Sequence, residues 1–265
     1  MFEWWWAYLA LGAFVGFFAG LLGIGGGAAM VPVLAFIYAA KGFDAGHVVH
    51  LALGTSMATI LFTSVSSVRA HHGHGAVNWA AVKRMAPGIV IGTFGGALLA
   101  SVLDVRLLAV VFTLLIYYIA WQMFFGKKPE AGALPMTTTG LNLSAALIGV
   151  ISSLTATGGA ALVVAWLVKR GIRIHEAIGT AAAVGWPLAA AGTAGYVLTG
   201  LGRSGMPEHS LGFVYLPALA GIVIASMLLA PLGAKLAHRT PGPLLKKIFA
   251  ALLFMLATKM LFSFL

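Results

Sequence analysis

Two glycine clusters interrupt long apolar stretches of this chain, one in each half. The first is GLLGIGGGAAMVP, residues 20–32, inside an apolar run from Trp4 to Ala40. The second is SLTATGGAALVVA, residues 153–165, which begins 133 residues later. Interrupted backbone at membrane depth is tolerated only where protein or an aqueous cavity satisfies the free N–H and C=O groups. The clusters therefore predict a transporter of two related halves, with its substrate site where the halves meet.

The composition indicates the solvent in which this chain folds. Hydrophobic residues make up 61% of the chain and charged residues only 8%, and the apolar segments have no polar face. This pattern predicts an all-α polytopic membrane protein and argues against soluble enzyme folds. The net charge of +10 comes from basic residues in short loops, where membrane topology explains them, so we expect no nucleic-acid partner. The chain has no cysteine, which excludes disulfides and thiolate sites.

Matching segments in the two halves predict an internal duplication. Aligning Gly16–Leu34 with Gly149–Leu167 gives seven identities in nineteen positions, and HLALGT at 50–55 pairs with HEAIGT at 175–180. The domains we expect are an N-terminal repeat at 1–126, a cytoplasmic linker at 127–139 and a C-terminal repeat at 140–265. The apolar segments lie at 5–22, 26–40, 46–68, 78–101, 105–125, 139–156, 159–168, 174–199, 211–237 and 243–265.

The basic residues favour one topology for these segments. If the first two segments of each half form either two crossings or a re-entrant hairpin, the Lys and Arg residues divide 12 against 4. If each pair is one continuous span, they divide 9 against 7. The positive-inside rule favours the first arrangement, in a bacterial-type cytoplasmic (inner) membrane with both termini on the non-cytoplasmic side. The fold we expect is therefore two inverted-topology repeats, each with a broken or re-entrant glycine-centred helix pair plus three spanning helices.

The apolar segments that are too short to cross the membrane predict an anion site at the two glycine clusters, where the helices would be broken. Segment 159–168 would span only about 15 Å as a helix, about half the hydrocarbon thickness. Helices that begin after the glycines, near Ala28 and Ala160, would aim their N-terminal dipoles and free N–H groups at the breaks, which attracts anions. The glycines that would bring bare amides close to a ligand are Gly25, Gly26 and Gly27 in the first half and Gly158 and Gly159 in the second. The alternative is that these small residues serve close helix packing.

Hydroxyl side chains add candidates for substrate binding. Thr55, Thr59, Thr63 and Ser67 recur every four residues and would line one helix face. We expect Thr55 and Ser56 to lie nearest the substrate, and Thr157 and Thr180 are weaker candidates. The alternative, especially for the later members of the stripe, is that each hydroxyl bonds the carbonyl four residues before it or joins neighbouring helices.

Histidines occur at equivalent positions in the two halves. His50 and His175 each begin an equivalent helix and could serve gating or pH sensing, or could simply meet headgroups and water. The loop RAHHGHG contributes His71, His72 and His74, with no carboxylate or cysteine nearby. We expect a solvated tract there and no metal site.

Five sequence motifs resemble those of a known family. These are GFFAGLLGIGGGAAMVPVL, HLALGTSMATI, GVISSLTATGGAALVVAWLV, HEAIGTAAA and PLGAKLAHR. Together they resemble the TauE/SafE sulfite exporter family over essentially the whole chain. The resemblance implies a membrane carrier for sulfur-containing or related organic anions, such as sulfite, sulfonates or sulfoacetate. Where the second copy reads TATGGA, the two breaks need not contribute equally.

The function we expect is secondary transport of such anions by alternating access, by export or uniport, without catalytic residues or a cofactor. No acidic or basic residue lies near the centre of any segment, which argues against a carboxylate proton relay. The partners are a small anionic substrate and the lipid bilayer, and a homodimer is compatible with a small carrier. The alternatives are an intramembrane hydrolase that uses Ser56 and His50, or an accessory subunit of a membrane complex.

Overall fold

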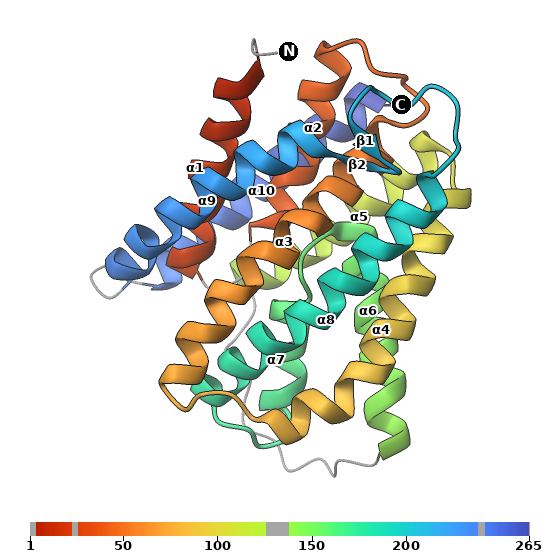
Figure 1. The fold of residues 1–265 in the computed structure, drawn as a ribbon. Coiled ribbons are helices and arrows are strands. Elements are labelled where there is room, and N and C mark those ends of the chain that lie inside the picture. The colour runs from red at the N-terminus through yellow and green to blue at the C-terminus, as the bar shows by residue number, and fades with distance from the viewer. Residues whose placement is uncertain (1–3, 23–25, 126–137, 238–241, 265) are drawn as a thin grey trace.

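The structure is a computed structural model that describes residues 4–22, 26–125, 138–237 and 242–264. Most of these residues are helical (Figure 1). The helices are α1 (Trp5–Leu22), α2 (Gly27–Ala40), α3 (Val48–Gly73), α4 (Trp79–Val102), α5 (Val105–Phe125), α6 (Thr138–Thr155), α7 (Ala160–Val168), α8 (Ile174–Gly200), α9 (Leu216–Ala237) and α10 (Gly242–Phe264). Two short strands, β1 (Ser210–Leu211) and β2 (Val214–Tyr215), form an antiparallel hairpin before α9.

The expectation of a helical, polytopic membrane protein is confirmed. Five of the described helices are long and apolar enough to cross a bilayer, namely α3, α4, α5, α8 and the Lys247–Phe264 part of α10. Each expected apolar segment corresponds to one helix, with ends that differ by no more than five residues. Gly25 and most of the expected linker, 127–139, lie outside the described residues.

One expected segment begins later than its apolar character suggested. Residues 211–215 belong to the hairpin, and α9 begins only at Leu216. His209 and Gly212 have positive φ angles of 63° and 55°, which a helix does not allow. The N–H of Phe213 donates instead to the carbonyl of Tyr196, at 3.1 Å, so the hairpin is fastened to α8.

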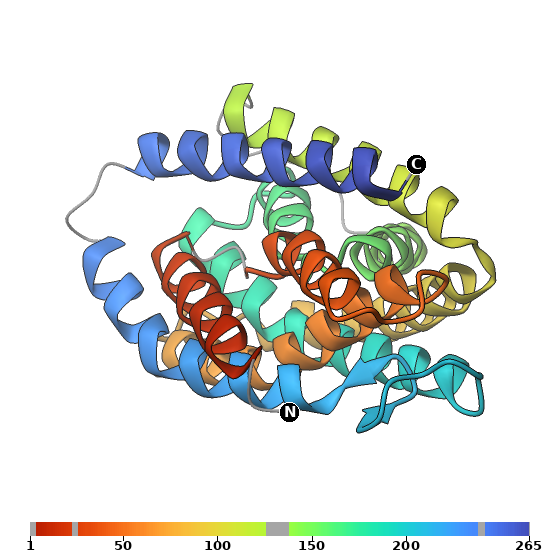
Figure 2. The same cartoon turned by 90° about the horizontal axis from the view of Figure 1, so that it is seen from above.

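The loops gather at two ends of the bundle, which we name by their contents. The hairpin end holds the α2–α3 loop, the α4–α5 turn and the β1–β2 hairpin, and the basic end holds the α3–α4 and α7–α8 loops (Figure 1). In Figure 1, α3 runs from the hairpin end to the basic end, and α8 runs beside it in the opposite direction. Seen from above, α2 lies inside the bundle, between α10 and α3 (Figure 2).

The main helix pairs follow a regular pattern. α1 packs along α9, α4 along both α6 and α8, α3 along α8, and α5 along α10. Exchanging α1–α5 with α6–α10 in chain order turns the α1–α9 pair into the α6–α4 pair and leaves the α3–α8 and α5–α10 pairs unchanged. The α4–α8 pair becomes the α9–α3 pair, which is less extensive. The contacts within one half are therefore few compared with the contacts between halves, so neither half forms a separate compact unit.

Glycine makes the closest of these pairs possible. On α4, a Cβ at Gly92 would lie only 2.6 Å from the Cα of Ala146 on α6. On α1, a Cβ at Gly12 would lie 2.7 Å from the Cα of Ile222 on α9. Membrane helices associate through close packing because lipid offers little hydrophobic driving force between them. The packing role that the sequence left open for small residues is therefore real at these two positions.

We expect Gly92→Ala to lower the free energy of unfolding by about 1–3 kcal/mol, because the added methyl group has no space against α6. Gly95 is the matched control on the same helix, since it is exposed and a Cβ there would meet nothing within 4 Å. Gly95→Ala should be neutral or stabilising by up to about 1 kcal/mol, because alanine favours a helix. Thermal unfolding of the purified proteins in one detergent measures both. Equal stability of the two variants would contradict the packing account.

Candidate functional site

The helices are interrupted between α1 and α2 and between α6 and α7, and we call these interruptions the two breaks. The two breaks meet inside the bundle. Gly27, the first residue of α2, lies against the carbonyl oxygen of Ala156, which follows α6. Ile60 of α3 covers both breaks, since its side chain would lie 2.8 Å from a Cβ at Gly27 and 3.6 Å from a Cβ at Gly158. The structure thus brings together Gly27 and Gly158, which the sequence placed at two separate breaks.

Three of the four residues between α6 and α7 have left-handed backbone. Ala156 has φ of 48°, and Gly158 and Gly159 have φ of 68°. Glycine adopts this conformation without the steric penalty that other residues incur. Gly159 is also the N-cap of α7, and a Cβ there would lie 3.0 Å from the hydroxyl of Ser152. A side chain at Gly159 would therefore be strained by the backbone and would also fill space at the start of α7.

The first break has a different local geometry. Gly26 is the N-cap of α2 with φ of −73°, and its carbonyl accepts from Ala29 and Met30 at 3.2 and 3.3 Å. Gly26 is buried, and a Cβ there would lie 2.9 Å from the carbonyl oxygen of Val15. Close approach of α1 is thus the reason for glycine at position 26, whereas backbone conformation is the reason at position 159.

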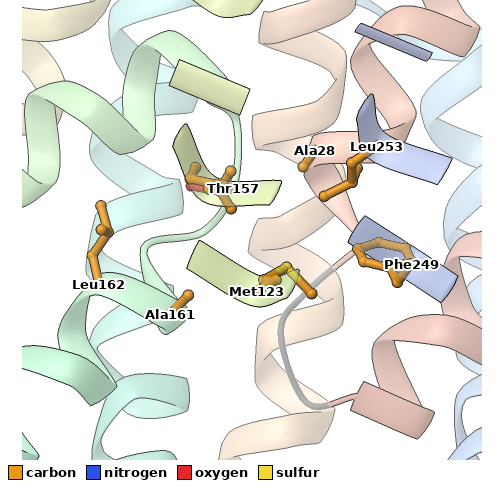
Figure 3. A pocket seen from close by; sticks show the side chains of 8 residues that line it. Ala28, Met123, Thr157, Ala161, Leu162, Phe249 and Leu253 are labelled. Atoms are coloured by element: carbon orange, nitrogen blue, oxygen red, sulfur yellow. The ribbon is translucent and has the colours of Figure 1, made fainter. Parts of the chain in front are cut away.

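A small cavity lies between the two helix starts. Ala28 in the first turn of α2, Thr157 in the second break and Ala161 in the first turn of α7 line it (Figure 3). Ala28 and Ala161 are 133 residues apart, the offset at which the sequence predicts a duplication. The rest of the wall is apolar and comes from α5, α7 and α10, through Ile119, Met123, Leu162, Phe249 and Leu253.

The cavity measures only about 10 Å³. This is about the space that a single water needs, so a larger solute requires the surrounding helices to separate. The first N–H groups of any helix have no carbonyl partner within that helix, and here Ala28 and Ala161, in the first turns of α2 and α7, both line the cavity. The arrangement can therefore present several hydrogen-bond donors to one acceptor-rich solute.

Two buried serines near the breaks have unpartnered hydroxyls. Ser56 and Ser152 are fully buried, and neither Oγ has a hydrogen-bond partner within the part of the chain that the structure describes. Ser56 precedes Ile60 by one helical turn, so it shares the α3 face that covers the breaks. Ser152 lies beside Gly159. Ser152 was missed by the sequence reasoning, because the sequence does not distinguish it from the other serines and threonines of this apolar segment.

Thr157 has a partner in this conformation. Its hydroxyl lies 3.1 Å from the hydroxyl of Thr155, which in turn donates to the carbonyl of Ile151 at 2.8 Å. Thr157 therefore belongs to a short chain of hydrogen bonds at the end of α6, and its hydroxyl keeps acceptor capacity toward the cavity. Its part in substrate binding stays a prediction.

Thr55 and Thr180 make equivalent contacts across the two halves, which we call the threonine clasps. The hydroxyl of Thr55 accepts the backbone N–H of Tyr215, and the hydroxyl of Thr180 accepts that of Asn78, both at 3.0 Å. Tyr215 immediately precedes α9 and Asn78 immediately precedes α4. Each threonine thus holds the residue that leads into a helix of the other half.

Glycine precedes the threonine in both clasps, and its role is steric. A Cβ at Gly54 would lie 2.9 Å from the carbonyl carbon of Phe213, and a Cβ at Gly179 would lie 2.7 Å from that of Ala76. The repeated motif HLALGT and HEAIGT is therefore explained by contacts between the halves. The clasps lie away from the cavity and are not part of its wall.

The later hydroxyls of the threonine stripe bond to their own helix. Thr59 donates to the carbonyl of Thr55 at 2.9 Å, and Thr63 donates to that of Thr59 at 3.2 Å. This confirms the back-bonding alternative for these two residues.

The two equivalent histidines differ in their surroundings. His50 is buried, its Nε2 lies 3.0 Å from the carbonyl oxygen of Ala100, and its ring stacks on Phe213 at 5.1 Å. His175 is exposed at the start of α8. Neither His50 Nδ1 nor Ser56 Oγ has a hydrogen-bond partner among the described residues, so the Ser56–His50 pair that a hydrolase would need is not formed there. In the histidine loop, Trp79 Nε1 donates to His72 Nδ1 at 3.2 Å, which gives that histidine a structural contact.

The clasps make a prediction about local stability. Thr180→Val should leave the N–H of the partly buried Asn78 without its acceptor and lower the free energy of unfolding by about 1 kcal/mol. Thr180→Ser keeps the acceptor and should lose only about 0.8 kcal/mol for its missing methyl group. Amide hydrogen exchange separates the two effects, since the Asn78 amide should exchange faster in the valine variant alone. Equal exchange in both variants would contradict the clasp.

Comparisons with known proteins agree with this architecture. A family profile described as "Sulfite exporter TauE/SafE" matches residues 8–260. A "Probable membrane transporter protein" of Haemophilus influenzae is 38% identical over 253 residues, which cover 95% of this chain and 96% of that protein. The "Probable membrane transporter protein YdhB" of Bacillus subtilis is 25% identical, over 88% of this chain and 90% of that protein.

A third relative is the "Probable inner membrane transporter protein TsaS" of Comamonas testosteroni, which is 30% identical over 68% of this chain and 73% of that protein. No solved structure matches the chain. The profile covers nearly the whole sequence, including both glycine breaks and both threonine clasps. The chain therefore belongs to the TauE/SafE sulfite exporter family of membrane transporters.

Proposed function

We propose that this transporter moves small sulfur-containing or organic oxyanions across the cytoplasmic membrane, through a site between the two chain breaks. The observation that carries the proposal is the shared cavity. Ala28 and Ala161, which lie in the first turns of two short helices from opposite halves, face it together with Thr157. The name of the family supports sulfite and related anions as the substrate class.

The chemistry of the site suits a weakly held oxyanion. The first turns of α2 and α7 supply N–H donors and the positive ends of two helix dipoles. None of the described residues that line the cavity is charged, so in this proposal the anion is held without a full counter-charge. Ser56 and Ser152 are buried close by, and their hydroxyls, which have no partner among the described residues, could donate to the anion. Dipoles and hydroxyls bind an anion less tightly than a buried lysine or arginine does, which allows release on the other side.

An inverted repeat explains how two such helix starts reach one place. α2 leads from the breaks to the hairpin end, whereas α7 leads from them to the basic end (Figure 1). The helix pairs exchange when the halves are exchanged, and so do the two threonine clasps. A duplication related by a two-fold axis in the membrane plane gives this pattern. The second half is then inserted upside down relative to the first.

The distribution of basic residues supports an orientation. Arg69, Lys83, Arg84, Lys169, Arg170 and Arg173 flank the loops of the basic end, and Lys41, Arg106 and Arg203 flank those of the hairpin end. We place the basic end in the cytoplasm by the positive-inside rule. Both termini then lie on the non-cytoplasmic side of the inner membrane.

Alternating access follows from the size of the cavity. At about 10 Å³ it has no room for an oxyanion, so we infer that the helices around it separate to admit one. At the hairpin end, Lys41 donates to the phenol of Tyr215 at 3.1 Å, and the phenol of Tyr38 donates to Thr55 at 3.2 Å. Because Tyr215 also donates to Thr55, these residues tie α2, α3 and the hairpin together. We infer that this network separates when the site opens to the non-cytoplasmic side.

Transport is driven by the gradient of the anion and by the membrane potential. An inside-negative potential favours export by about 2.3 kcal/mol per negative charge at 100 mV. The segments carry no carboxylate near their centres, which supports uniport over proton coupling through an acidic relay.

Flux into liposomes tests the proposal. The purified protein should transport at least one of sulfite, thiosulfate, sulfoacetate and taurine at a saturable rate, with no imposed proton or sodium gradient. Gly26→Leu and Gly159→Leu should each lower the rate more than tenfold while membrane insertion is retained, because leucine at 26 displaces α1 from the start of α2 and leucine at 159 fills space at the start of α7. Gly73→Leu is the control, since a Cβ at Gly73 meets nothing within 4 Å.

The possible failures are distinguishable. Wild-type protein that moves none of these anions, or that needs an imposed ion gradient, would contradict the proposed transport. Normal flux in both glycine variants, with an active wild type, would contradict only the proposed site.

A further inference from the structure

A second and much larger cavity lies outside the proposed transport site. This groove measures about 420 Å³ and lies between α3, α4 and α8. We call it the tryptophan groove, and its wall includes Val68, Arg69, Trp79, Val82, Trp186 and Pro187. None of these residues lines the cavity at the breaks. Its volume falls within the range of ordinary ligand pockets, about 300–1,000 Å³.

The groove opens on the outside of the bundle, near the basic end. Trp79 begins α4 directly after the α3–α4 loop and is 42% exposed, and Trp186 on α8 is 47% exposed. Indole rings favour the boundary between headgroups and hydrocarbon. The groove therefore extends from the level of the headgroups at Trp79 into the hydrocarbon layer along α8.

Among the described residues of the groove wall, one side chain is charged, and it is a cation. This is Arg69, which is exposed on the last turns of α3, and none of those wall residues is a carboxylate. The remainder of the wall is almost entirely apolar. A guanidinium beside an apolar channel is complementary to a molecule with an anionic head and a hydrocarbon tail. A small inorganic anion would gain nothing from the apolar part of this surface.

Comparison with the other half indicates that the helices fold without Arg69, Trp79 and Trp186. The clasps align Thr55 with Thr180 and Asn78 with Tyr215. By the same offsets, Ala194 stands where the other half has Arg69, Leu216 where it has Trp79, and Leu61 where it has Trp186. The helices thus form in the other half without the arginine or the two tryptophans. The three residues together form a feature of one end of the molecule alone.

We propose that the tryptophan groove binds one phospholipid with an anionic headgroup. The phosphate pairs with the guanidinium of Arg69, and an acyl chain lies against Trp186, Val68 and Val82. This site goes beyond the proposed function, because it does not depend on which solute the protein carries. Pro187 lines the groove, and its neighbour Leu188 contacts the second break, so the lipid lies beside the helix that bounds the transport site.

Native mass spectrometry of the purified, delipidated full chain tests the site. Phosphatidylglycerol and phosphatidylcholine with identical acyl chains are titrated separately. We expect one phosphatidylglycerol to bind at least tenfold more tightly than phosphatidylcholine. Arg69→Gln should remove this preference, because it removes the charge and the bidentate donor, whereas Arg69→Lys should restore part of it.

Arg84→Gln is the matched control. Arg84 is exposed on α4 near the same end but does not line the groove, so its loss should change the affinity less than twofold. Trp186→Ala should weaken both lipids, because the acyl chain loses its wall. Thermal unfolding without lipid identifies a variant that is merely misfolded. Equal affinity for the two lipids, or an equal loss in Arg84→Gln and Arg69→Gln, would overturn the proposal.

Discussion

A chain that is interrupted inside a bilayer must satisfy its free backbone groups from within the protein, because hydrocarbon offers no hydrogen bonds. Here the two interruptions are placed against each other. Gly27 at the start of α2 lies on the carbonyl of Ala156 at the end of α6, and Ile60 covers both. Backbone that would be costly beside lipid is buried at the centre of the bundle. The same contact brings the first turns of two helices to one cavity, and the proposed anion site follows from it.

Contacts between long helices, together with the threonine clasps, hold the two halves so that the breaks stay against each other. Long pairs join α1 to α9 and α4 to α6, and glycines such as Gly92 let the backbones approach. The threonine clasps then fasten the entrance of α4 to α8 and the entrance of α9 to α3. Because every one of these contacts joins different halves, a movement of one half against the other must either carry them along or break them.

Much of the fold could be predicted from the sequence, since length and hydropathy determine a membrane helix more directly than they determine a soluble one. The limits of α5 and α7, for example, were predicted closely. The hairpin was missed because residues 211–215 are as apolar as a helix, and the positive φ of Gly212 is set by its contact with α8.

The candidate site was predictable only in part. Glycine clusters indicated the breaks, and the repeat indicated that they were related. The hydrogen bonds of Thr55 and Thr180 could not be predicted from the sequence, because their partners lie 160 and 102 residues away. Ser152 was overlooked for a similar reason, since a serine in an apolar helix signals nothing until its neighbours are known. His50 and His175 looked equivalent, yet only His50 is buried, because Phe213 and α4 cover it.

The most direct test of the central claim uses the absence of cysteine from the chain. Thr157→Cys places a single thiol in the wall of the cavity at the breaks, and Leu143→Cys places one on the exposed, lipid-facing side of α6 as a control. A membrane-impermeant maleimide is applied from each side of oriented vesicles, with and without the transported anion. The account predicts that the cysteine at 157 is labelled from both sides and protected by the anion, whereas the cysteine at 143 is not labelled. Labelling at 157 from one side only, or labelling that the anion does not slow, would contradict a shared site between the two breaks.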